Sequence, residues 1–212
     1  MDVDATLGGD IQHALGQDAA IIGVMSGDFV QRGDFAVVRR QARAKAAVES
    51  GVDLVLELPL PWAVGSAERF ADGGVGVLEA TGVVDNLAFG SECGDIEALT
   101  RAADILLSDK FSAIVSEKIK SGVTFAAARE DAAKELGIDG DILSSPNDNL
   151  GIEYIIAAKR LNLNIKFRCV KRRGALHDSK DLDAMFVSSS LIRQKLLEDN
   201  FAFAEKFMPI PI

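Results

Sequence analysis

The sequence predicts an α/β fold in which helices cover both faces of a parallel sheet. Short apolar runs alternate along the chain with segments of helix-forming residues, and the connections between them are short. Some of the apolar runs are continuous, which is typical of strands that are buried on both faces. Strands that alternate with helices are joined by right-handed crossovers, and such crossovers produce a parallel sheet.

The composition is that of an ordinary globular protein. The chain has 212 residues, of which 48% are apolar and 26% are charged, and its net charge is −9. We therefore predict one domain over residues 1–212 and no indiscriminate binding to nucleic acid. No apolar run approaches the ~20 residues that cross a bilayer, and the start does not resemble a signal peptide. With two cysteines and two histidines, we expect a reduced cytoplasmic protein without a disulfide framework or a histidine-rich metal site.

The first two predicted strands flank a helix. Residues 19–25 form an uninterrupted apolar run that stops at a serine and a glycine. Good helix formers dominate residues 39–50, and Gly51 supplies a C-terminal stop. The second strand covers residues 53–58, and Pro59 ends it because proline has no backbone N–H to donate to a neighbouring strand.

The middle of the chain is predicted to be mostly helical. A helix over residues 66–81 contains several glycines, which weaken it, so we expect close packing against a neighbour to stabilise it. Residues 86–89 form the third strand. Further helices are expected over residues 95–136, with Asp95 and Asp109 as N-caps.

The last third of the chain contains one more strand between two helices. A polar loop over residues 144–149 opens a helix over residues 150–161, and the fourth strand covers residues 165–170. Three serines at residues 188–190 open a final helix that continues to Leu197. Glycine, polar and basic residues follow the predicted strands. Because ligands of such folds bind at the carboxyl ends of the strands, this pattern indicates a phosphate-bearing ligand.

Basic residues suggest where phosphates would bind. Residues 36–48 and 164–173 are basic stretches without an acid, and each fits a specific anion site or a solvated face equally well. Arg172 follows the fourth strand, where it can pair with a phosphate or remain solvated. The serines at 188–190 lie with Arg193 at a helix N-terminus, which favours an anion. One serine alone would be explained as a helix cap.

Two polar or glycine positions complete the candidate site, each with a structural alternative. The amide of Asn147 can contact a base or a ribose, although its segment can also simply cap a helix. Gly90 permits close approach of a ligand to the backbone, or it forms a plain turn. No P-loop, Ser-His-Asp pattern or zinc spacing occurs. Cys93 and Cys169 are interpreted as inert packing residues.

Seven stretches occur in the order and spacing of a known family. They are VMSGDFVQRGD at 24–34, ARAK at 42–45, GVDLVLELP at 51–59, FGSECGDI at 89–96, PNDNLGIEY at 146–154, KRRGA at 171–175 and SSSLIR at 188–193. Over residues 19–197 the chain resembles the bacterial tRNA(Met) cytidine acetate ligases. The resemblance implies a Rossmann-like nucleotidyltransferase fold.

The resemblance also implies an activity and a set of ligands. The family activates acetate with ATP to give acetyl-adenylate, and then acetylates N4 of the wobble cytidine of elongator tRNA(Met). A divalent cation, Mg²⁺, would accompany ATP and neutralise phosphate charge. The positions that match ATP-binding residues of the family are Gly90, Asn147, Arg172, Ser188, Ser190 and Arg193.

The chain departs from the family pattern in several places. The family opens with a strand and an Asn-Pro-Phe-His-Asn-Gly-His loop that supplies catalytic histidines. Residues 1–5 do not match that loop, and His13 is too far along the chain to replace either histidine. Ser190 replaces a threonine, and Asp148 stands where the family has asparagine. We therefore assign no catalytic residue, and we expect the central first strand and the family's C-terminal region to be missing.

Two other functions stay open at this point. One is another small-molecule adenylyltransferase of the same superfamily, because fold and phosphate motifs are shared across it. The other is a non-catalytic nucleotide-binding remnant, which the unmatched histidine loop favours. The motifs at 24–34 and 89–96 favour the ligase.

Overall fold

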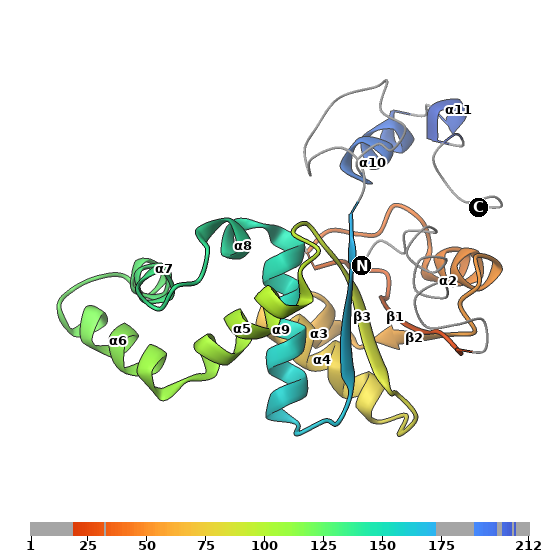
Figure 1. The fold of residues 1–212 in the computed structure, drawn as a ribbon. Coiled ribbons are helices and arrows are strands. Elements are labelled where there is room, and N and C mark those ends of the chain that lie inside the picture. Colours follow the sequence, from red (N-terminus) through yellow and green to blue (C-terminus); the bar gives the residue numbers. More distant parts are fainter. Residues whose placement is uncertain (1–18, 32, 173–188, 199–200, 205, 207–212) are drawn as a thin grey trace. The chain divides into compact units, whose positions relative to one another are not determined.

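A computed structural model describes residues 19–31, 33–172, 189–198, 201–204 and 206 (Figure 1). Strands and helices alternate as predicted, and the described strands are β1 (Ile22–Ser26), β2 (Leu54–Leu58), β3 (Asn86–Ser91) and β4 (Lys166–Lys171). The described helices are α2 (Arg40–Glu49), α3 (Leu60–Ala63), α4 (Ala67–Glu79), α5 (Ile96–Leu107), α6 (Asp109–Lys120), α7 (Phe125–Glu135), α8 (Gly140–Ser144), α9 (Pro146–Arg160), α10 (Ser189–Leu197) and α11 (Phe201–Ala204). No described helix has the length and apolar character needed to cross a bilayer.

The contacts within the chain define two compact units. One unit comprises residues 1–66 together with 172–212, and the other comprises residues 67–171. The strands pair in two parallel two-stranded sheets, β1 with β2 in the first unit and β3 with β4 in the second. The parallel pairing and the α/β class are thus as expected, whereas one domain over residues 1–212 stays a prediction.

In the first unit, β1 and β2 run side by side with α2 against them. Ile22 pairs with Leu54 at one end of the sheet, and Ser26 pairs with Leu58 at the other. Val24 and Met25 of β1 are buried, as its continuous apolar run predicts, whereas in β2 Leu58 is buried and Leu54 is exposed. Gly51 ends the α2 segment with φ of +98°, a value that glycine adopts at little cost.

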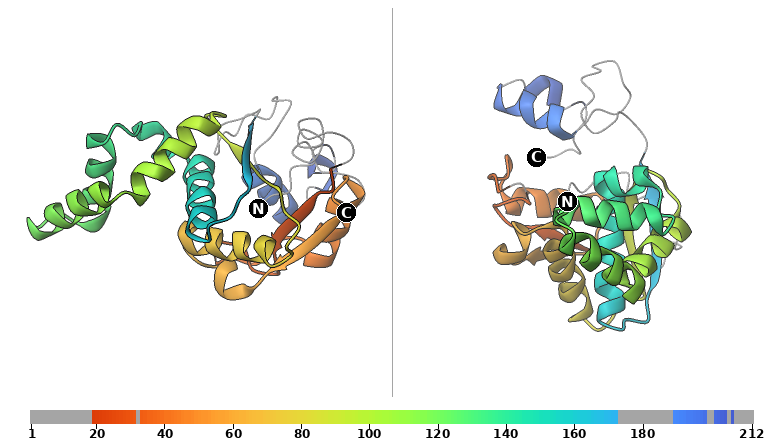
Figure 2. Two further views of the ribbon diagram at one scale, coloured as in Figure 1. Left: turned by 60° about the horizontal axis from the view of Figure 1, so that its bottom comes forward. Right: turned by 90° about the vertical axis from the view of Figure 1, so that its left-hand side faces the viewer.

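The second unit is built around α9, which packs against α4, α5 and β3 (Figures 1 and 2). Gly73 and Gly74 of α4 are buried, and a Cβ on Gly74 would lie 3.9 Å from the Tyr154 ring of α9. An added Cβ at Gly74 would therefore make only an ordinary contact, and the packing of α4 on α9 is the close neighbour that the sequence predicts for the helix at 66–81. Ile152 and Ile155 of α9 are fully buried in this core.

Two helix starts differ from the prediction. The helix expected from residue 150 begins at Pro146, so the predicted loop supplies its first turn. Proline suits this place because the first N–H groups of a helix have no intrahelical partner. The predicted N-cap Asp109 is instead the first residue of α6, and the hydroxyl of Ser108 accepts the capping bond from the Phe111 N–H at 3.2 Å.

An ion pair between a half-buried arginine and a buried glutamate joins α7 to α9 in the second unit. The Arg129 guanidinium donates to the carboxylate of Glu153 at 2.9 Å, and Glu153 is buried. Burial raises the pKa of the Glu153 carboxyl, and the charge of Arg129 opposes that rise. Arg129 is therefore the main group that favours the ionised form of Glu153.

We expect Arg129→Ala to destabilise the protein more at pH 7 than at pH 4. Without Arg129 the folded-state pKa of Glu153 rises further, so the folded protein binds a proton that the unfolded chain releases, and stability falls as pH increases through that pKa. At pH 7 the loss should be about 1–2 kcal/mol. Urea unfolding at both pH values measures it, with the exposed Arg101→Ala as control, whose pair with Glu97 is a surface contact. An equal loss at both pH values would contradict this role.

Candidate functional site

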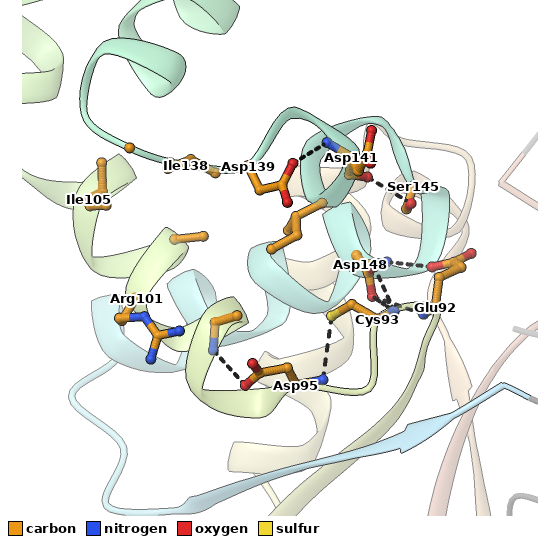
Figure 3. A pocket seen from close by; sticks show the side chains of 14 residues that line it. Glu92, Cys93, Asp95, Arg101, Ile105, Ile138, Asp139, Asp141, Ser145 and Asp148 are labelled. Atoms are coloured by element: carbon orange, nitrogen blue, oxygen red, sulfur yellow. Dashed lines mark hydrogen bonds between the residues drawn. The ribbon is translucent and has the colours of Figure 1, made fainter.

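Two carboxylates join the end of β3 to the start of α9, and we call the pair Glu92 and Asp148 the carboxylate clasp (Figure 3). Asp148 accepts the Glu92 N–H at 2.9 Å and the Cys93 N–H at 3.1 Å, and it also accepts the hydroxyl proton of Ser91. The loop that leaves β3 is therefore attached to the first turn of α9.

Glu92 completes the clasp in the opposite direction. Its carboxylate accepts the backbone N–H of Asn147 at 3.3 Å and that of Asp148 at 2.9 Å. Ser145, the residue at the N-cap position, makes no capping bond with its side chain. Glu92 thus caps α9 from another element, and its negative charge is favourable beside the positive end of the helix dipole.

The core of the clasp is closed to solvent. Asp148 is 1% exposed and Ser91 is 0% exposed. Burying a carboxylate costs free energy unless hydrogen bonds replace its hydration, and here two N–H groups and one hydroxyl supply them. One turn further along α9, Gly151 packs on Phe89, where an added Cβ would lie 2.4 Å from the ring. Helix and strand therefore meet with no room for a side chain.

Two of the predicted ATP-binding residues adjoin the clasp. Gly90 lies in β3, paired with Val170, and is two residues before Glu92. Asn147 is the second residue of α9, and its Nδ2 donates to Glu92 at 2.5 Å. In the second unit, the end of β3 and the side-chain amide of Asn147 therefore lie at one hydrogen-bonded cluster.

The other predicted ATP-binding residues belong to the first unit. Arg172 directly follows β4 in the chain and is exposed. Ser190 and Arg193 lie in the first turns of α10, as the serine motif predicts, whereas Ser188 lies outside the described residues. The convergence of these residues with Gly90 and Asn147 stays a prediction.

The first basic stretch, residues 36–48, serves the structure of the loop after β1. Arg43 donates to the carbonyl oxygens of Ser26 and Val38, each at 3.0 Å. Arg40 binds both carboxylate oxygens of Glu57, at 2.8 and 2.9 Å. Arg40 and Arg43 therefore bind groups of the protein itself, which favours neither of the two predicted roles, an anion site or a solvated face.

A cavity of about 700 Å³ lies beside the clasp in the second unit (Figure 3). It is lined by Glu92, Cys93, Asp95, Ala98, Arg101, Ala102, Ile105, Gly137, Ile138, Asp139, Asp141, Ile142, Ser145 and Asp148. Asp95 caps α5 by accepting the Ala98 N–H at 2.9 Å, as predicted, and Asp139 caps α8. Asp95 and Asp139 of the acidic wall are therefore engaged in capping the N-termini of helices.

The two cysteines lie near Ser91. Cys93 Sγ is 3.4 Å from the Ser91 hydroxyl and accepts the Asp95 N–H at 3.4 Å. Burial raises the pKa of the Cys169 thiol, which keeps it protonated and weakly nucleophilic. This favours the predicted packing role. Among the residues that the structure describes, no group of three or more metal-ligating side chains occurs.

Glu92 and Asp148 were not among the residues predicted to bind a ligand. A signal was present, because Glu92 follows the strand-ending Gly90 and Ser91, and Asp148 follows Asn147 directly. Only the fold shows that the segments around Glu92 and Asp148, about 55 residues apart in the chain, are joined by hydrogen bonds.

Comparisons with known proteins agree with the motifs. A family model described as HIGH Nucleotidyl Transferase matches residues 10–211. The chain is 42% identical to a tRNA(Met) cytidine acetate ligase of Caldanaerobacter subterraneus subsp. tengcongensis, over 89% of this chain and 48% of that protein. It is 40% identical to the ligase of the same name from Thermotoga maritima, over 89% of this chain and 47% of the relative. The chain spans about half the length of the curated relatives it matches.

Solved structures give the same result. The crystal structure of Thermotoga maritima TmcAL, apo form I, is 37% identical and superposes with a TM-score of 0.88, covering 97% of this chain and 51% of that chain. The structure of TmcAL bound with alpha-thio ATP is 36% identical, with a TM-score of 0.84, and covers 97% and 50%. The predicted family resemblance and fold class are confirmed.

Proposed function

Because the chain belongs to the HIGH nucleotidyl transferase family, we propose that it carries the ATP-binding part of a tRNA(Met) cytidine acetate ligase. Acetate and elongator tRNA(Met) are its further substrates, and acetyl-adenylate is the intermediate. The carboxylate clasp is the observation that carries this proposal. It holds Gly90 and Asn147 at the carboxyl end of β3, where ligands of parallel α/β folds bind.

Each of the six predicted positions contributes a contact to ATP in this proposal. Gly90 and Asn147 contact the nucleoside end of ATP. Gly90 has no side chain and leaves its backbone accessible, and Asn147 offers its side-chain amide. Arg172 and Arg193 bind phosphate oxygens, with Ser188 and Ser190 as neutral donors. A Mg²⁺ ion carried by ATP would neutralise part of the triphosphate charge beside these arginines. The relative solved with alpha-thio ATP supports a triphosphate ligand.

The chemistry requires positioning and charge neutralisation more than a general base. An acetate oxygen attacks the α-phosphorus, the bond to the bridging oxygen of the β-phosphate breaks, and pyrophosphate leaves. Arginines and amide donors stabilise the charge on the phosphoryl oxygens. In the second step N4 of cytidine attacks the acetyl carbonyl carbon, loses a proton and displaces AMP.

Arg172→Ala should weaken ATP binding by about 1–3 kcal/mol, which is roughly 5- to 150-fold in Kd, because a charged hydrogen bond to phosphate is lost. Isothermal titration of ATP into the 212-residue chain measures the change. Arg168→Ala is a matched control, because Arg168 is an exposed arginine on the preceding β4. Equal affinities of the wild type and the Arg172 variant would reject the assignment.

The proposed function itself is tested by acetate-dependent release of pyrophosphate and by transfer of labelled acetyl to tRNA(Met). We expect ATP binding with poor acetyl transfer from this chain, because residues 1–5 do not match the histidine loop. ATP binding with no acetate-dependent pyrophosphate release would favour a nucleotide-binding protein without ligase activity. Failure to bind ATP would contradict the proposal.

A further inference from the structure

We infer that Glu92 is a positioning residue that fixes the amide of Asn147 in one orientation, so that Asn147 selects nucleotides that offer a hydrogen-bond donor. The inference rests on the proposed function, since it takes Asn147 to face the nucleoside. It goes further by assigning the selectivity to Glu92, which lies on another element.

The first step is the direction of one hydrogen bond. An ionised carboxylate can only accept, so the Asn147 atom that lies 2.5 Å from Glu92 must be the donor Nδ2. Turning the amide over would place its oxygen against a carboxylate oxygen, which is repulsive. Charge-assisted bonds of this kind are stronger than neutral ones. The amide of Asn147 is therefore locked.

The second step is that Glu92 cannot turn away to release the amide. Its two oxygens also accept the backbone N–H groups of Asn147 and Asp148. Its own N–H donates to Asp148 at 2.9 Å, and Asp148 is buried. The acceptor that orients Asn147 is thus held from both sides of the clasp.

The third step concerns what Asn147 offers a ligand. One of the two Nδ2 hydrogens is donated to Glu92, which fixes the side on which the amide oxygen lies, so a nucleoside group that faces this oxygen must donate a hydrogen bond to it. Adenosine offers two kinds of donor, the exocyclic amine of the base and the ribose hydroxyls. A base with a carbonyl at the same place as the amine would repel the amide oxygen. A polar site rejects a ligand that leaves its groups unpaired.

The test compares ATP with three analogues by isothermal titration into the 212-residue chain. Inosine triphosphate replaces the exocyclic amine with a carbonyl, and 2′-deoxy-ATP and 3′-deoxy-ATP each lack one ribose hydroxyl. We expect the wild type to bind at least one analogue 10-fold or more weakly than ATP. Loss with inosine triphosphate identifies the base amine as the donor, and loss with a deoxy analogue identifies the ribose. Equal binding of all four nucleotides overturns the inference while leaving ATP binding intact.

Variants separate orientation from a merely structural effect. Glu92→Gln keeps the shape of the side chain but leaves one acceptor oxygen for three donors. The NH₂ group of the substituted side chain can then face the Asn147 amide and favour its flipped orientation. We expect the ratio between ATP and the discriminated analogue to fall to about 3-fold or less, as in Asn147→Ala. Glu117→Gln on α6, an exposed control, should keep the wild-type ratio. If Glu92→Gln weakens ATP and the analogue by the same factor, the inference is wrong. Absence of ATP binding by the wild type overturns the proposed function together with the inference.

Discussion

Replacing Asp148 with alanine is expected to lower the free energy of unfolding by roughly 3–5 kcal/mol. The substitution leaves the Ser91 hydroxyl and the N–H groups of Glu92 and Cys93 without their acceptor, and each buried unpaired group costs about 1–3 kcal/mol. Ser91 and Asp148 are closed to solvent, so water has little access to replace the carboxylate. Urea denaturation followed by circular dichroism measures the loss.

The same experiment has a graded variant and a matched control. Asp148→Asn restores the residue expected from the family pattern and keeps one oxygen, so its cost should be about 1–2 kcal/mol, chiefly at the Cys93 N–H. Asp109→Ala removes an exposed carboxylate from the first turn of α6 and should cost less than about 1 kcal/mol. Similar losses for Asp148→Ala and Asp109→Ala would show that the clasp contributes little to stability.

Gly151→Ala should destabilise the protein by about 1–3 kcal/mol, although alanine is the better helix former. The added Cβ would lie 2.4 Å from Cε2 and 2.9 Å from Cδ2 of Phe89, so α9 or the ring must move. Overpacking of this kind costs more than the gain of about 1 kcal/mol in helix propensity. Thermal or urea unfolding measures the difference.

Gly76→Ala in α4 is the control with the opposite sign. A Cβ at Gly76 meets nothing within 4 Å, so only the helix propensity changes and stability should rise by about 0.5–1 kcal/mol. A gain at both glycines would mean that the contact between α9 and β3 is looser than the structure indicates.

The strands were predictable because their signal is local. Short segments rich in apolar residues, continuous only at β1, located β1, β2, β3 and β4 to within a few residues. The exception is the end of β3, which continues through Gly90 and Ser91 although neither residue favours strands. Their pairing with Val170 and Lys171 of β4 decides the outcome, and that pairing is invisible in the local sequence.

The start of α9 shows why helix boundaries were harder to predict. Its cap is Glu92, more than fifty residues earlier in the chain, and not a side chain of its own segment. A prediction based only on capping residues within the segment therefore places Pro146 and Asn147 in a loop. The cap of α6 is local, but the adjacent residues Ser108 and Asp109 both suit the N-cap position, and the structure uses Ser108.

The predicted ATP-binding positions came from the family motifs, whereas the partners of these residues could not be predicted. Gly90 and Asn147 match ATP-binding positions of the family, and the structure puts both beside the clasp. The charges of Arg40 and Arg43 suggested an anion. Their partners are a carboxylate on β2 and carbonyl oxygens after β1, contacts that only the fold brings together.

Hydrogen–deuterium exchange with and without saturating ATP gives a direct check on the proposal that residues far apart in the sequence bind one nucleotide. We expect slower amide exchange on ATP addition in residues 89–94, 146–150 and 189–195. Protection confined to residues 89–150 or to residues 189–195, or no protection in any of these segments, would contradict the proposal.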